Sequence, residues 1–136
     1  MKVKLLKDVP LPKKSHLPDS GLDLFIPEDF SLRSLETITL GLGIAVAIPE
    51  GHAGILVPRS SIAKQGLLIQ TSIIDPDYTG EIHLIITNCG KDTINIEKGQ
   101  RVCSLCCFSV LNPYVEIVTE LPQTERGDAG LGSTGK

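Results

Sequence analysis

The sequence contains no tryptophan and few aromatic residues of any kind. Its 136 residues include three Phe, two Tyr and one Met, so aromatics make up only 4% of the chain. A hydrophobic core must therefore be built mainly from Val, Ile and Leu, which are residues that suit β-strands. Because 41% of the residues are hydrophobic, the chain has enough apolar material for one domain of ordinary size.

An excess of positive charge is also missing, since the formal net charge is −3. A nucleic-acid-binding domain of this size usually presents a basic face. The composition therefore predicts no nucleic-acid partner. A ligand that carries phosphate would have to be captured by a few local cations.

No apolar run approaches the roughly 20 residues that span a bilayer, so we expect no membrane partner. The stretch 1–14 is basic, but it lacks a long apolar centre and is interrupted by Pro10 and Pro12, unlike a secretory signal. These features predict a protein that is not secreted and is cytoplasmic, or nuclear or inside a virus-infected cell. They also predict a reducing compartment.

The cysteines include a C-x-x-C spacing, which can bind metal or carry out redox chemistry. Cys103, Cys106 and Cys107 lie in a run that is typical of a strand. Alternation along a strand places Cys103 and Cys107 on one face and Cys106 on the other, so one metal could not collect all three without a turn. The favoured interpretation is core packing, with a metal or redox site as the alternative.

Short β-rich runs alternate with turn signals, which is typical of an all-β sandwich or barrel. The segment 1–121 is expected to form this domain, and the polar, Gly-rich residues 122–136 a flexible arm. A short helix is expected to begin within 60–65. The expected strands are 2–6, 24–26, 37–40, 44–48, 54–57, 67–69, 73–74, 82–87, 93–96, 101–110 and, with weak alternation, 114–118.

The turn 75–80 joins two apolar runs and contains Asp75 and Tyr78. Asp and Gly suit turn backbones without any functional role. However, a large aromatic at a turn tip often packs on something, and a carboxylate beside a pocket can orient a water as a general base.

Two further segments offer groups for phosphate. Arg59 is followed by Ser60 and Ser61 at an expected strand-to-helix step, which supplies a cation and hydroxyls, although a serine there can also be an ordinary helix cap. The C-terminal segment 126–135 is rich in glycine, whose backbone amides can wrap anions. The alternative for that segment is a disordered tail.

In this order and spacing, the motifs resemble those of the trimeric dUTPase family (deoxyuridine triphosphate nucleotidohydrolases). The resemblance covers nearly the whole chain. It is carried by five segments, 20–24, 58–61, 73–81, 98–102 and 126–135.

The resemblance implies a jelly-roll-like β-barrel in each subunit of a homotrimer. It also implies three sites at subunit interfaces, each closed by the C-terminal arm of a neighbouring subunit. The implied reaction is hydrolysis of dUTP to dUMP and pyrophosphate with Mg²⁺ as cofactor. Phosphoryl chemistry of this kind depends mainly on positioning and on neutralising charge.

The implied residue roles fall on matching positions of this sequence. Asp75 would hold the water that attacks the α-phosphorus, Tyr78 would pack under the deoxyribose, and Asp23 would help to place Mg²⁺ through a water. The hairpin backbone near 69–74 would read the uracil edge. The other implied substrate-binding residues are Arg59, Ser60, Ser61, Ser72, Ile74, Ser104, Arg126, Leu131, Gly132, Ser133 and Thr134.

Three positions differ from the family pattern. Ser72 replaces a glycine and would be strained if its backbone needed a positive φ. Ser104 replaces a glutamine, and Leu131 replaces an aromatic that stacks on uracil, so we expect weaker binding. These changes leave open a dUTPase-derived adaptor with little catalysis. A related dCTP deaminase is disfavoured, because the stretch 83–88 lacks the acidic residue of that family.

Overall fold

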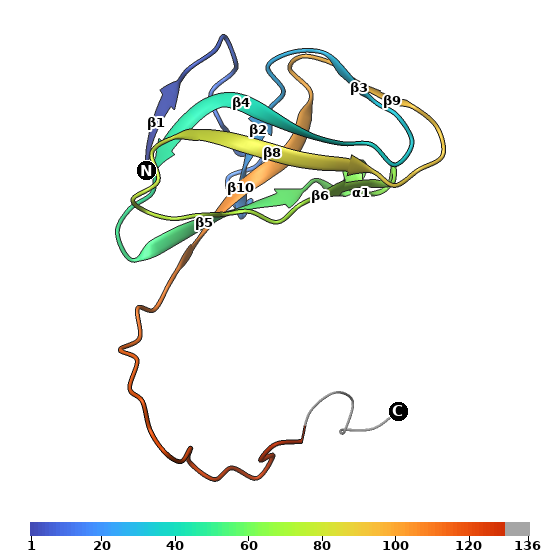
Figure 1. Cartoon of the computed structure of the whole chain (residues 1–136). Helices are drawn as coiled ribbons and strands as arrows, with labels where there is room; N and C mark the ends of the chain where they lie inside the picture. The colour runs from blue at the N-terminus through green and yellow to red at the C-terminus, as the bar shows by residue number, and fades with distance from the viewer. Residues whose placement is uncertain (130–136) are drawn as a thin grey trace.

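The computed structural model describes residues 1–129, which form two four-stranded sheets, one two-stranded sheet and one short helix (Figure 1). All strand pairs are antiparallel. The first sheet has the order β1 (Lys2–Leu5), β4 (Thr37–Ala47), β8 (Glu81–Asn88), β6 (Leu67–Ile69), and the second β2 (Gly21–Phe25), β10 (Arg101–Ser109), β5 (His52–Pro58), β7 (Ile73–Ile74). Strand β3 (Phe30–Leu32) pairs with β9 (Ile94–Ile96), and α1 spans Ser60–Ala63.

The prediction of an all-β fold with one short helix is confirmed, and apart from shifted strand ends the strands differ from it in three ways. The runs expected at 37–40 and 44–48 form one strand, β4, which continues through its glycines. Strand β3 was not expected at all. The strand expected at 114–118 was wrong, because that segment is extended and exposed and has no strand beside it.

The hydrophobic core lies between the two large sheets and is aliphatic, as the composition predicts. Strand β8 shows the alternation clearly, with Ile82, Leu84 and Ile86 each at most 1% exposed. Leu56 of β5 and Leu105 of β10 close the core from the other sheet. Burying each such side chain contributes about 1.5–3 kcal/mol of transfer free energy.

One of the two buried polar residues of the described chain is structural. Asn88, at the end of β8, is fully buried. Its Nδ2 donates to the carbonyls of Leu32 at 3.0 Å and Asp92 at 2.8 Å, and its Oδ1 accepts from the backbone N–H of Gly90 at 2.9 Å. Because every bond is to backbone, Asn88 holds the loop after β8 against β3 and leaves no polar group unsatisfied.

Leu35 is the only residue other than glycine with a positive φ, 61°, within residues 1–129. Its side chain is 78% exposed, so packing does not compensate for a conformation that disfavours a branched residue. We expect Leu35→Asn to raise the free energy of unfolding by about 0.5–1 kcal/mol, measured by equilibrium urea denaturation. Leu11→Asn, at another exposed leucine, is the control and should give no such gain.

The cysteine interpretation is confirmed for one position. Cys103 is buried, and this burial raises the pKa of its thiol to about 12. Cys106 is half-buried and Cys107 is exposed, so those two do not pack in the core. All four cysteines are free thiols, and within residues 1–129 no three His, Cys, Asp or Glu side chains are grouped to hold a metal.

Beyond β10 the chain leaves the barrel, and residues 111–129 follow an extended, exposed path (Figure 1). The exposed side chains there include Tyr114, at 93%, and Ile117, at 97%. None of the helices among residues 1–129 has the length and hydropathy to cross a bilayer.

Candidate functional site

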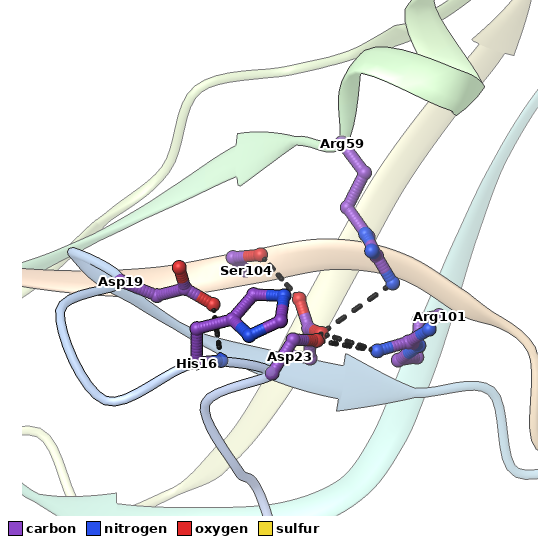
Figure 2. Close-up of polar contacts among 7 residues, drawn as sticks. His16, Asp19, Asp23, Arg59, Arg101 and Ser104 are labelled. Atoms are coloured by element: carbon purple, nitrogen blue, oxygen red, sulfur yellow. Dashed lines mark hydrogen bonds and ion pairs between the residues drawn. The ribbon is translucent and has the colours of Figure 1, made fainter.

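Asp23 is the second buried polar residue, and it lies at the centre of a charged cluster (Figure 2). Its Oδ1 accepts a hydrogen bond from the Ser104 hydroxyl at 2.9 Å. Its Oδ2 accepts from the Ser15 hydroxyl at 2.9 Å and from Arg101 Nη1 at 3.0 Å, and it pairs with Arg59 Nη1 at 3.4 Å. Two guanidinium groups therefore share one carboxylate, and the cluster keeps a net positive charge.

The fold brings this cluster together from four segments. Asp23 and Ser104 are register partners on β2 and β10, and Arg59 follows the end of β5. The loop before β2 contributes Ser15, because a backbone bridge joins Lys13 to Asp23. Ser15 also accepts a hydrogen bond from Arg101 Nη1 at 2.6 Å.

The sequence prediction included Asp23, Arg59 and Ser104 but not Ser15 or Arg101. Arg101 lay within the fourth family motif without a role of its own. Ser15 had no sequence signal, since its position in the cluster depends on a single bridge between distant segments. Both residues bond to Asp23 and directly to each other.

The environment keeps Asp23 ionised. Burial raises the pKa of the Asp23 carboxyl, but the hydrogen bonds from Ser104 and Ser15 lower it, as do the charge of Arg59 and the hydrogen bond from Arg101. The net result is a pKa below the ordinary value of an aspartate. A buried carboxylate is tolerated here because each of its oxygens has a partner.

Arg59 and the following serines are arranged for external contacts. Arg59 is the N-cap residue of α1, and no side chain forms a cap hydrogen bond there. The alternative that Ser60 or Ser61 is an ordinary helix cap is therefore wrong. Both serines are exposed, so their hydroxyls are accessible from solvent.

A second feature is a hollow of about 230 Å³ between the 73–78 segment, β5 and β8. Asp75 lies at this hollow and is exposed, and Tyr78 and Ile74 also line it. The further lining residues are Leu56, Ser72, Ile73, Glu81, Ile82, His83 and Ile85. The hollow is thus mainly apolar with a few polar groups, as small-molecule sites generally are.

The Tyr78 ring is held against its own turn. Its hydroxyl donates to the carbonyl of Glu81 at 2.8 Å, and its backbone N–H donates to the carbonyl of Asp75 at 3.1 Å. The ring lies over Gly80 so closely that a Cβ there would be 2.6 Å from the hydroxyl oxygen. A glycine is therefore required at position 80 for this ring orientation.

Ser72 and Ser104, which depart from the family pattern, have different environments. Ser72 is not among the residues with positive φ, so the strain expected for a serine at this position is absent. Its carbonyl accepts the backbone N–H of Leu56 at 3.2 Å. The Ser104 hydroxyl is bonded to Asp23 and thus belongs to the charged cluster.

The charged cluster and the hollow are separate within one chain. Ile74, next to Asp75, is paired with Gly54 at the start of β5, whereas Arg59 follows its end. Gly54 and Arg59 are five residues apart along the chain, which is about 16 Å at roughly 3.3 Å for each residue of a strand. Asp75 and Arg59 therefore lie toward opposite ends of β5 within one chain.

Of the predicted C-terminal site residues, the structure describes only Arg126. Arg126 lies in the exposed segment after β10, where its Nε donates to the carbonyl of Ala129 at 2.8 Å. Leu131, Gly132, Ser133 and Thr134 lie outside the described residues.

The Asp23 carboxylate fits the implied Mg²⁺ only through a bridging water. Its Oδ2 already has three partners, while Oδ1 has one hydrogen bond, from Ser104. Oδ1 can therefore accept a further bond from a metal-bound water. Mg²⁺ commonly keeps several waters and binds substrate phosphates with one or two carboxylates, so the donor set agrees with an outer-sphere role.

Known proteins resemble this chain over nearly its whole length. The deoxyuridine 5'-triphosphate nucleotidohydrolase of Corynebacterium glutamicum is 41% identical, with 98% of this chain and 93% of the relative aligned. The enzyme of that name from Rattus norvegicus is 35% identical over 98% of this chain, and the chain spans 66% of its length.

Solved structures agree with this result. The dUTPase of Staphylococcus bacteriophage 80alpha, solved with dUPNHPP, is 29% identical, with a TM-score of 0.95 and coverage of 99% of this chain and 98% of that one. The match confirms the predicted jelly-roll-like fold. The dUTPase family model matches residues 7–135, a span that includes the Asp23 cluster and the Asp75 hollow, and the chain therefore belongs to the dUTPase family.

Proposed function

We propose that the protein hydrolyses dUTP to dUMP and pyrophosphate, with Asp75 positioning the attacking water. The observation that carries the proposal is the hollow in which an exposed carboxylate, Asp75, adjoins an aromatic ring, Tyr78, that is fixed by its own turn. The relatives named as deoxyuridine triphosphate nucleotidohydrolases support the same substrate and reaction.

In the proposed reaction the oxygen of water forms a bond to the α-phosphorus. The bond from that phosphorus to the bridging oxygen of the β-phosphate breaks, so pyrophosphate leaves and dUMP remains. Asp75 accepts the proton of the water and later releases it to solvent. A fixed carboxylate within hydrogen-bond reach supplies both orientation and general-base catalysis.

The nucleoside is proposed to occupy the hollow. Tyr78 has the hydroxyl end of its ring over Gly80 and would pack under the deoxyribose, where the ring would exclude a ribose 2′-hydroxyl. The backbone near Ser72 and Ile74 would read the uracil edge, because fixed N–H and C=O groups reject a base with a different donor and acceptor pattern.

The triphosphate is proposed to bind the charged cluster of a neighbouring subunit. Arg59 and the hydroxyls of Ser60 and Ser61 offer a cation and donors for phosphate oxygens. Arg126, Ser133 and Thr134 would add contacts from the arm, with Leu131 and Gly132 over the base. Mg²⁺ would neutralise phosphate charge, with Asp23 Oδ1 holding one of its waters.

Sites shared between subunits would explain why Asp75 and Arg59 lie toward opposite ends of β5 in one chain. Near the start of β5, the acidic residues Glu50, Asp75 and Asp77 line a second surface hollow. The other end carries Arg59 and Arg101. Opposite charges at the two ends favour head-to-tail association, which closes into a ring when the rotation permits. This supports a ring such as the proposed homotrimer, with Asp75 and Arg59 of each site on different subunits.

Mixing two inactive variants tests this arrangement. We expect Asp75→Asn and Arg59→Ala to be nearly inactive when pure, and their refolded equimolar mixture to recover about a quarter of wild-type activity. Random assembly gives each shared site an intact Asp75 and an intact Arg59 with that frequency. The measurement is pyrophosphate release from dUTP with Mg²⁺.

Each variant refolded alone is the control, since refolding must not restore activity by itself. If both residues came from one subunit, every site in the mixture would carry one defect. A mixture that stays inactive, although mass spectrometry shows mixed trimers, would therefore refute sites shared between subunits. No release from dUTP by the wild-type trimer would refute the proposed reaction itself.

A regulatory role is a second candidate. The 80alpha dUTPase with dUPNHPP is described as one of the phage dUTPases that control transfer of virulence genes, and its fold matches this chain closely. An adaptor that does not use nucleotide would bind no dUTP and show no dUTP-dependent protection of residues 122–129 from proteolysis. Protection by dUTP would favour the enzyme or a regulator that responds to nucleotide.

A further inference from the structure

Strand β4 carries an irregularity directly opposite the start of β8. Gly41 pairs with His83 and Ala45 pairs with Glu81, so residues 42–44 of β4 lie opposite Ile82 alone. Gly43 within this bulge has a φ of 70°. Extra residues in one strand interrupt the ladder and leave backbone groups without their usual partner.

The side chain of Glu81 fills the interruption. Its Oε1 accepts the backbone N–H of Gly43 at 2.8 Å. The carboxylate also lies against Gly41, where an added Cβ would be 2.5 Å from Oε1. The first residue of β8 is therefore tied to β4 through its side chain at the point where the regular ladder is broken.

Glu81 also lines the hollow that is proposed to hold the nucleoside. Its carbonyl accepts the Tyr78 hydroxyl at 2.8 Å and contacts Nδ1 of His83 at 2.9 Å. Tyr78, Glu81 and His83 all line the hollow. A single residue thus binds the β4 bulge with its carboxylate and fixes the tyrosine ring with its carbonyl.

We propose that Glu81 is a positioning residue for sugar selection, which acts by anchoring the carbonyl that orients Tyr78. The proposal rests on the proposed function, in which the Tyr78 ring excludes a ribose. Without the carboxylate, the Gly43 N–H loses its partner and the Glu81 carbonyl loses its anchor. The ring then becomes free to move away from the 2′ position.

The test compares kcat/KM for dUTP with kcat/KM for UTP. In Glu81→Ala the dUTP preference should fall about fivefold to tenfold, the effect of losing roughly one hydrogen bond. Glu81→Asp should show a similar loss, because its carboxylate is one methylene too short to reach Gly43. Glu81→Gln, whose Oε1 can still accept that N–H, should keep the preference within about twofold of wild type.

A double-mutant cycle separates this mechanism from general damage. Tyr78→Phe removes the hydroxyl that uses the Glu81 carbonyl, so adding Glu81→Ala to it should lower the preference little further. Fully additive effects would overturn the proposal. If Glu81→Ala does not fold, the Glu81→Asp variant, singly and with Tyr78→Phe, carries the same test.

Tyrosine fluorescence gives a readout that does not depend on activity. The chain has no Trp and two Tyr, and Tyr114 is in the exposed segment, so Tyr114→Phe leaves Tyr78 as the only fluorophore. In that background Glu81→Ala should lower the fluorescence anisotropy, and Glu81→Gln should not. Wild-type hydrolysis with equal dUTP preference and equal anisotropy in Glu81→Ala would refute the inference while leaving the proposed function intact.

Discussion

Replacing Asp75 with asparagine is expected to lower kcat for dUTP hydrolysis by about a thousandfold. The amide keeps the size of the side chain but cannot accept the proton of the attacking water, and a general base contributes typically about 10²–10⁴-fold. KM should change much less, because the nucleoside and phosphate contacts remain. The measurement is steady-state pyrophosphate release over a range of dUTP concentrations.

The structure predicts that Asp75→Asn folds normally. Asp75 is exposed, and its structural bond is made by its backbone carbonyl to the Tyr78 N–H, which the substitution leaves in place. Asp8→Asn is a matched control for loss of one negative charge, since the side chain is fully exposed in a pair with Lys98. Retention of more than about a tenth of wild-type kcat in Asp75→Asn would contradict the assigned role.

The sequence predicted the elements whose signals are local. Strand β8 is rich in apolar and β-branched residues and was placed within one residue at each end. Strand β3 was missed because its sequence, Phe-Ser-Leu, contains no β-branched residue, and it depends on β9, with Phe30 opposite Ile96. The prediction divided strand β4 at Gly41 and Gly43, because glycines normally indicate a break. The signal for continuity is not local, since the Glu81 carboxylate that fills this bulge comes from another strand.

The same distinction applies to the site. Asp75 and Tyr78 lie within one turn, so their motif could be read along the chain. The Asp23 cluster combines groups as far apart as Ser15 and Arg101, which are separated by 86 positions. No periodic or turn signal connects them. The family motifs gave Asp23 and Arg59, but the contacts of Ser15 with Asp23 and Arg101 are visible only in the folded chain.

Replacing Asp23 with asparagine is expected to lower the free energy of unfolding at neutral pH by about 2 kcal/mol. The substitution leaves Arg59 and Arg101 close together without their shared carboxylate. Breaking a fully buried ion pair costs about 3–5 kcal/mol, but the two Arg side chains are 27% and 38% exposed, and solvent screening reduces the cost. Urea denaturation at constant protein concentration measures the difference.

The pH dependence should identify the carboxylate as the cause. Because the pKa of Asp23 is lower in the folded protein than in the unfolded chain, its stabilising effect is complete above the unfolded value and is lost as pH falls through the folded one. Wild type should therefore lose this contribution below about pH 4. The difference between wild type and Asp23→Asn should shrink in that range and stay constant from about pH 5 to 7.

Glu36→Gln provides the control, because Glu36 also has a pKa lowered by an arginine, Arg33, but in a pair within one turn whose arginine is 80% exposed. Its removal should change stability much less, since exposed pairs contribute little. A difference between wild type and Asp23→Asn that stays constant down to pH 2 would mean that the lost stability comes from packing. The two guanidinium groups would then be held by Ser15 and the strands, with the charge of Asp23 contributing nothing to the fold.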